Sequence, residues 1–144
     1  MGETMRDYFD IQLTPDQLRA MSSLALAHMG DCVYEILVRG WLCSGGLEVN
    51  KNLHRETVAL VRAGAQADAL DKILPLLTPE ETGVVHRGRN ANVHMIPKGA
   101  SRGEYRKATA LEALFGWLYL QHKTERINQL FDAIMTPAGG EEDT

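Results

Sequence analysis

The chain has 144 residues, enough for one hydrophobic core, and its 44% hydrophobic and 24% charged residues are ordinary for a globular protein. A net charge of −4 argues against a protein that coats nucleic acid indiscriminately, and no apolar run is long enough to predict a membrane span. The N-terminus lacks the basic segment and apolar block of a secretion signal, and Cys32 and Cys43 show neither disulfide nor metal-ligand spacing. We therefore expect a cytoplasmic protein that has no membrane partner.

The sequence predicts an all-α fold. Three capping sequences, in which Ser or Thr is followed three residues later by Glu or Gln, mark helix starts after Thr14, Thr78 and Ser101. Helices are expected at residues 15–43, 51–74, 78–90, 101–122 and 124–135. The predicted domain organisation is an N-terminal segment at 1–14, one helical domain at 15–135 and a disordered acidic tail at 136–144.

Two acidic residues lie four positions apart in the first long helix. Asp31 and Glu35 project roughly opposite a stripe of core residues formed by Leu26, Met29, Val33 and Leu37. Like charges at this spacing repel each other unless they face water or share a cation. Glu35 suits either role, as a water-facing side chain or as an acid near a cation.

Asp31 is harder to explain as a surface residue, because it follows Gly30 inside an otherwise strong helix. Asp and Gly are both poor helix formers, so two consecutive residues here reduce the stability of the helix. The pair predicts that another backbone approaches closely here and that a short carboxylate is needed.

Glu112 is the second candidate carboxylate, in the middle of an apolar helix. Ala108, Thr109 and Gly116 share its face and are all small. Small neighbours leave room for a hydrated metal ion or a substrate, but they also suit close helix packing in which Glu112 binds a nearby donor. If Asp31 and Glu112 meet across the core, they offer the hard oxygen ligands that Mg²⁺ or Mn²⁺ prefers.

A basic stretch separates the two acidic helices. Between His86 and Lys107 the chain carries a net charge of +5, whereas the remainder carries −9. A solvated helix face can produce such a block, but its concentration in one Gly-containing segment favours phosphate contacts. The candidate contact residues are Arg87, Arg89, Asn90, Lys98, Arg102 and Arg106.

Residues 24–35, with the sequence LALAHMGDCVYE, resemble the signature helix of ribonuclease III domains. They are most similar to the short branch of that family called Mini-ribonuclease III. The resemblance covers about residues 20–135 and continues, in the family's order and approximate spacing, through blocks at 52–54, 63–67, 85–91 and 105–120. A Gly-Asp pair alone is not specific, whereas these blocks together are.

The resemblance implies an all-α endonuclease domain that forms a homodimer and cuts double-stranded RNA with Mg²⁺, leaving short 3′ overhangs. It implies that Asp31 and Glu112 are the two central metal-binding and catalytic carboxylates. Mini-ribonuclease III proteins lack a separate double-stranded-RNA-binding domain, and none is expected after residue 135. Their characteristic role is maturation of large-subunit (23S) ribosomal RNA, so a precursor of that RNA is the expected partner.

The sequence departs from full-length ribonuclease III where that family has additional acids before the central carboxylates. The corresponding positions are Leu24, Ala27 and Thr109, which leaves fewer metal ligands, as in Mini-ribonuclease III. The missing acids favour an alternative, a non-catalytic helical module that binds RNA or a ribosome-assembly intermediate. A helical protein–protein adaptor is a third interpretation. Retention of both Asp31 and Glu112 favours the nuclease.

Overall fold

Three helices begin at the capping boxes seen in the sequence. In the computed structural model, which describes residues 5–46, 52–91 and 98–137, the side chains of Thr14, Thr78 and Ser101 accept the expected backbone hydrogen bonds. They open the helices α1 (Pro15–Ala20), α5 (Pro79–Arg89) and α6 (Arg102–Leu120). Together with α7 (Thr124–Met135), these bounds confirm the last three predicted helices to within two residues.

The prediction of one helix at 15–43 was wrong, because the chain breaks after α1. Met21 is extended, and the Ser22 hydroxyl accepts a hydrogen bond of 3.0 Å from the N–H of Ala25. Ser is more favourable as an N-cap than inside a helix, so a new helix, α2 (Ser23–Trp41), starts here. A short turn at Leu42–Gly46 follows it.

The prediction of one helix at 51–74 was also wrong. It is divided into α3 (Leu53–Val61) and α4 (Ala63–Ile73) by Arg62, which has extended backbone angles. Gly64, where the sequence indicated a weak point, lies buried in the first turn of α4. Residue 51, residues 92–97 and residues 138–144 of the predicted tail lie outside the described residues.

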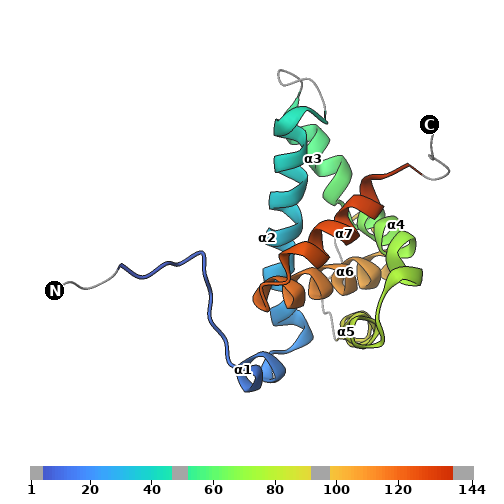
Figure 1. The fold of residues 1–144 in the computed structure, drawn as a ribbon. Helices are drawn as coiled ribbons and strands as arrows, with labels where there is room; N and C mark the ends of the chain where they lie inside the picture. Colours follow the sequence, from blue (N-terminus) through green and yellow to red (C-terminus); the bar gives the residue numbers. More distant parts are fainter. Residues whose placement is uncertain (1–4, 47–51, 92–97, 138–144) are drawn as a thin grey trace.

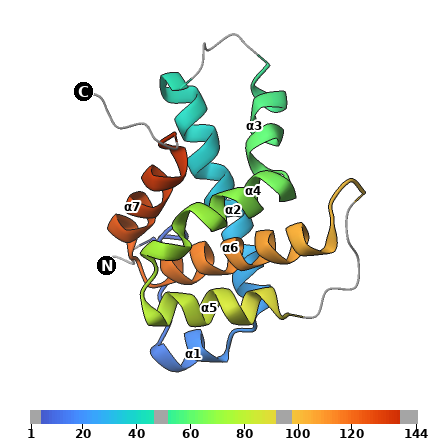
Figure 2. The same cartoon turned by 90° about the vertical axis from the view of Figure 1, so that its right-hand side faces the viewer.

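Helix α6 is the centre of the fold and packs against α2, α4, α5 and α7. Figure 1 shows α2 upright with α6 crossing it, and Figure 2 shows α5 running alongside α6. The described residues contain no strand, which confirms the all-α prediction. Within the same residues, no helix is long and apolar enough to cross a membrane.

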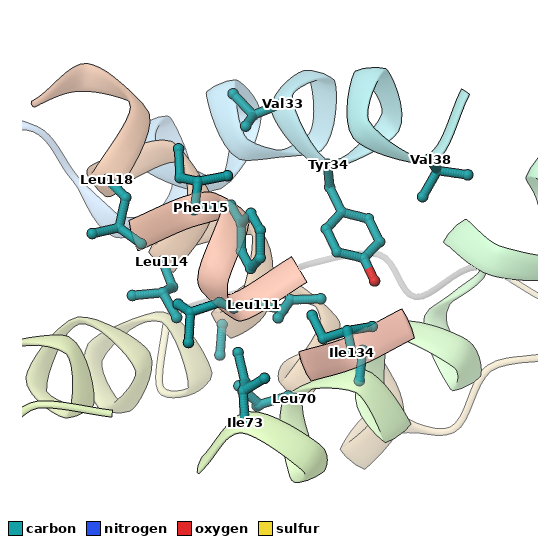
Figure 3. Packing of buried hydrophobic residues seen from close by; sticks show 14 of the residues in the cluster. Val33, Tyr34, Val38, Leu70, Ile73, Leu111, Leu114, Phe115, Leu118 and Ile134 are labelled. Atoms are coloured by element: carbon teal, nitrogen blue, oxygen red, sulfur yellow. The ribbon is translucent and has the colours of Figure 1, made fainter. Parts of the chain in front are cut away.

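The main core fills the space between α2, α4, α6 and α7. Tyr34 of α2 meets Phe115 of α6 edge to face, with ring centroids 5.3 Å apart (Figure 3). Leu70 and Ile73 of α4 and Ile134 of α7 complete this part of the core. Close packing of these side chains sets the position at which α2 crosses α6.

A second, smaller core joins α5 and α6 to the N-terminal part of the chain. Ile11 and Leu13 pack against it, and His122 contacts the carbonyl of Ile11 at 2.7 Å. The Tyr119 hydroxyl donates a hydrogen bond of 3.2 Å to the carbonyl of Phe9. The segment that precedes α1 is therefore held against the end of α6.

Candidate active site

The backbones of α2 and α6 nearly touch where the two candidate carboxylates lie. A Cβ atom added to Gly30 would lie 1.6 Å from the carbonyl oxygen of Glu112, and one added to Gly116 would lie 2.1 Å from that of Leu26. Only glycine fits at these two positions, which confirms the close approach predicted at Gly30. Because Asp31 follows Gly30 directly, the crossing brings its side chain to Glu112.

The two acids interact with each other. Asp31 is exposed and Glu112 is partly buried, and the two carboxyl groups lie close enough for Asp31 to raise the pKa of Glu112. Burial, and then the charge of Asp31, raise the pKa of Glu112 from 4.5 to about 8, although a hydrogen bond from Gln66 acts in the opposite direction. Without a cation, Glu112 therefore keeps its proton near neutral pH.

This raised pKa predicts how the stability of the metal-free protein depends on pH. The folded state holds the Glu112 proton more tightly than the unfolded state, so the free energy of unfolding falls as the pH rises from about 4.5 to about 8. Glu112→Gln removes this fall. In urea titrations with EDTA, we expect the free energy of unfolding of wild type to fall by roughly 1–3 kcal/mol relative to that of Glu112→Gln between about pH 5 and pH 9.

Other titrating groups are common to both proteins, so the difference between the two isolates Glu112. Equal pH dependence in wild type and Glu112→Gln would contradict the assignment. Addition of a divalent ion at about pH 9 should restore the stability of wild type but should not change the stability of Glu112→Gln.

The paired carboxylates fit a divalent cation. Among the described residues no three His, Cys, Asp or Glu side chains are grouped to hold a metal, so protein carboxylates would supply two ligands. Mg²⁺ commonly keeps several waters and binds through one or two carboxylates together with substrate phosphates. Two acids that repel each other when both ionised would be stabilised by such an ion.

A pocket of about 410 Å³ opens beside Glu112. It is formed by the start of α4, residues 98–100 and the first half of α6, with Arg62, Gln66, Lys98, Tyr105 and Thr109 among its lining residues. The side chains of Arg62 and Lys98 are cationic and exposed. The pocket therefore has space and positive charge for a phosphate group next to the carboxylates.

The structure separates the predicted phosphate-contact residues. Of the six, only Lys98 lines the pocket beside Glu112. Arg87 lines a different pocket, between α5 and α1, together with Leu18 and Trp117. Exposed positions on or after α5 and on α6 are occupied by Arg89, Asn90, Arg102 and Arg106.

The side chains of Glu35 and Thr109 both have partners other than the carboxylate pair. Glu35 forms an ion pair of 2.6 Å with Arg39 one turn later, which favours the water-facing interpretation. The Thr109 hydroxyl donates to the carbonyl of Tyr105 at 3.0 Å.

Glu81 is a second acid in the protein interior, and its contacts support the fold. It caps α5 and accepts two hydrogen bonds from Arg126 of α7, at 2.8 and 2.9 Å. These contacts, chiefly the hydrogen bonds from Arg126, lower the pKa of Glu81. A buried acid that only supports the fold is thus paired with a cation here, whereas Glu112 is paired with an acid.

Sequence reasoning missed Gln66 and Arg62 as members of the site. Gln66 is only 2% exposed, lines the same pocket as Glu112, and its side-chain amide acts to lower the pKa of Glu112. A signal existed, because Gln66 shares the spacing of Leu70 and Ile73 and so falls on the buried stripe of α4. A polar residue at such a position needs a buried partner.

The ribonuclease III domain family matches residues 24–123 of this chain. The fold is thus that of a ribonuclease III endonuclease domain. Two relatives are named Mini-ribonuclease 3: one from Symbiobacterium thermophilum is 44% identical over 76% of this chain and 85% of its own length, and one from Enterococcus faecalis is 37% identical over 94% and 96%.

A crystal structure of a protein from Fusobacterium nucleatum has the same fold. It is 31% identical, with a TM-score of 0.75 over 83% of this chain and 97% of its own. The chain belongs to the ribonuclease III family, in the Mini-ribonuclease III branch. It is an endoribonuclease of the family that acts on double-stranded RNA with divalent metal ions, which sets aside the non-catalytic module and the adaptor.

Proposed function

We propose that Asp31 and Glu112 together hold a Mg²⁺ ion, for which Mn²⁺ can substitute, at the catalytic site of this endoribonuclease. The observation that carries the proposal is the meeting of these two acids beside a pocket that has room for a phosphate. A bound divalent ion supplies Lewis acidity to water and neutralises charge on the phosphate. Asp31 and Glu112 hold the ion, and the buried side of the site limits access of bulk water.

The basic residues form the proposed grip on the RNA backbone. Lys98 and Arg62 line the pocket at the carboxylates, so they contact phosphates close to the cleaved bond. The remaining proposed contacts, which extend the grip along the duplex, are Arg87, Arg89, Asn90, Arg102 and Arg106. Duplex RNA is recognised mainly through its shape, so sequence preference is weak.

Salt dependence tests the proposed contacts on α5. Each phosphate contact releases counterions when the duplex binds. Arg87→Ala combined with Arg89→Ala removes two such contacts, so it should weaken duplex binding and reduce the slope of the logarithm of the binding constant against the logarithm of the salt concentration by roughly 1–2. The matched control is Arg6→Ala with Lys123→Ala, which changes the net charge equally outside residues 86–107. A slope that changes equally in both double variants would remove the end of α5 from the RNA interface.

We further propose that the protein acts as a homodimer formed through the outer face of α2. Opposite its buried face, α2 carries the exposed residues Cys32 and Ile36, and Ile36 is 68% exposed. In Figure 1 the left-hand side of α2 has no other helix of the described chain packed on it. A two-fold interface here places two copies of Asp31 in one particle, as cutting both strands of a duplex requires. Sedimentation should give the mass of two chains.

The proposed natural substrate is a precursor of large-subunit (23S) ribosomal RNA, and the proposed location is the cytoplasm. The substrate follows from the branch of the family to which the chain belongs. The location is supported by the free thiols of Cys32 and Cys43, which are typical of a reducing compartment.

Cleavage of defined RNAs tests the function. Wild type is incubated with a perfect RNA duplex, a 23S precursor stem and a single-stranded RNA, in Mg²⁺, in Mn²⁺ and in EDTA. We expect cuts in both strands of the two duplexes in either metal, none in EDTA and none in the single strand. Cleavage in EDTA would refute the metal site, and cleavage of the plain duplex without the 23S stem would refute only the proposed substrate.

A further inference from the structure

Gln66 is a buried amide directly beside the Glu112 carboxylate. Its side chain is 2% exposed, it comes from α4, and it lines the same pocket as Glu112. Its side-chain amide lies close enough to the carboxylate to lower the pKa of Glu112. Burial of an amide is unfavourable unless the amide has a hydrogen-bond partner, and the Glu112 carboxylate in the same pocket is the acceptor that we assign to Gln66.

We propose that Gln66 is a positioning residue of the active site, whose amide fixes the orientation of the Glu112 carboxylate next to Asp31 so that both acids can bind one divalent ion. This inference rests on the proposed metal site. It assigns a role to a third helix, because α2 supplies Asp31, α6 supplies Glu112 and α4 supplies the group that orients Glu112.

The neutrality of the donor is what makes an amide suitable. A cationic donor at this place would pair with Glu112, as Arg126 pairs with Glu81, and would repel a metal ion. An acid would add a third negative charge to a pair that already repels. An apolar side chain would leave the partly buried carboxylate without its donor. A glutamine holds the carboxylate and leaves its charge available to the ion.

The small number of acids in this site increases the importance of that orientation. Leu24 and Ala27 are apolar, and the Thr109 hydroxyl is engaged by the carbonyl of Tyr105. With two carboxylates as ligands, a rotation of either one removes half of the protein's charge contribution. Partners that orient metal ligands typically change metal affinity or activity by about 10–100-fold when they are replaced.

The test compares Mn²⁺ binding, followed by electron paramagnetic resonance without RNA, in wild type, Gln66→Met, Gln66→His and Thr57→Val. Gln66→Met preserves volume and removes the donor, whereas Gln66→His keeps a neutral donor. Thr57→Val is the matched control, because Thr57 is also buried but donates to the carbonyl of Leu53 in its own helix. Circular dichroism reports whether each variant is folded.

We expect Gln66→Met to bind Mn²⁺ about tenfold more weakly or worse, with Gln66→His intermediate and Thr57→Val unchanged. The Mg²⁺ concentration for half-maximal cleavage should rise by the same factor, while the KM for duplex RNA at saturating Mg²⁺ stays constant. A structural role alone would not separate metal dependence from KM in this way.

Equal Mn²⁺ binding by wild type and Gln66→Met would overturn the positioning role and leave the proposed function intact. Absence of Mn²⁺ binding by wild type would overturn the metal site and the positioning role together. If Gln66→Met does not fold, Gln66→His decides, because complete loss of Mn²⁺ binding in a folded variant that retains a neutral donor contradicts the proposal.

Discussion

Asp31→Asn is expected to lower the rate of duplex RNA cleavage by about a thousandfold or more, roughly 4 kcal/mol of transition-state stabilisation. The substitution keeps the size of the side chain and its exposed position on α2, so the fold should be unaffected. It removes one of only two carboxylates at the proposed metal site. Glu112→Gln should have a similar effect on the rate, while it stabilises the metal-free protein at high pH.

The measurement is single-turnover cleavage of an end-labelled duplex in Mg²⁺, with duplex binding measured separately in Ca²⁺ or EDTA. Asp68→Asn is the control, because Asp68 is an exposed acid on α4 that does not line the pocket beside Glu112. We expect Asp68→Asn to cleave at the wild-type rate and all variants to bind duplex RNA. Wild-type cleavage by Asp31→Asn would show that the catalytic acids are elsewhere.

Gly30→Ala is expected to destabilise the protein by at least about 3 kcal/mol, because the helices must separate to admit a methyl group. The added Cβ would lie 1.6 Å from a backbone oxygen of α6, and a backbone atom cannot move aside as a flexible side chain can. Separation of α2 from α6 also moves Asp31 away from Glu112. Any folded Gly30→Ala protein should therefore cleave much more slowly than wild type.

Gly40→Ala is a matched control for this prediction. Gly40 lies on the same helix, is exposed, and has nothing within 4 Å of the position of an added Cβ. Alanine is the better helix former, so this variant should gain about 0.5–1 kcal/mol in urea unfolding. Gly116→Ala should behave like Gly30→Ala. A Gly30→Ala protein as stable as wild type would contradict the close crossing of α2 and α6.

The helix starts could be predicted because capping is local. At Thr14, Thr78 and Ser101 the cap and its partner lie three residues apart, so the sequence itself contains both halves of each interaction. The breaks at Met21 and Arg62 were missed, because apolar residues with helical spacing continue across both of them. The Ser22 cap was a local signal of the first break that we did not use, whereas no side-chain cap marks the second break at Arg62.

The two carboxylates were also visible in the sequence, since an unfavourable Gly-Asp pair and an acid in an apolar helix are both local anomalies. That they meet is a property of the fold. Asp31 and Glu112 are brought together by a helix crossing that depends on Gly30 and Gly116, which are 86 positions apart in the sequence.

The sequence by itself therefore determined the helical class, most helix starts, the two candidate acids and the resemblance to ribonuclease III. Only the tertiary structure decided that Gln66 lines the same pocket as Glu112, that Arg62 joins Lys98 there, and that Arg87 lines a different pocket. The physical reason is the separation along the chain over which each kind of interaction acts. Caps and helical periodicity act within one or two turns, whereas the surroundings of a carboxylate are set by residues from other helices that packing brings to it.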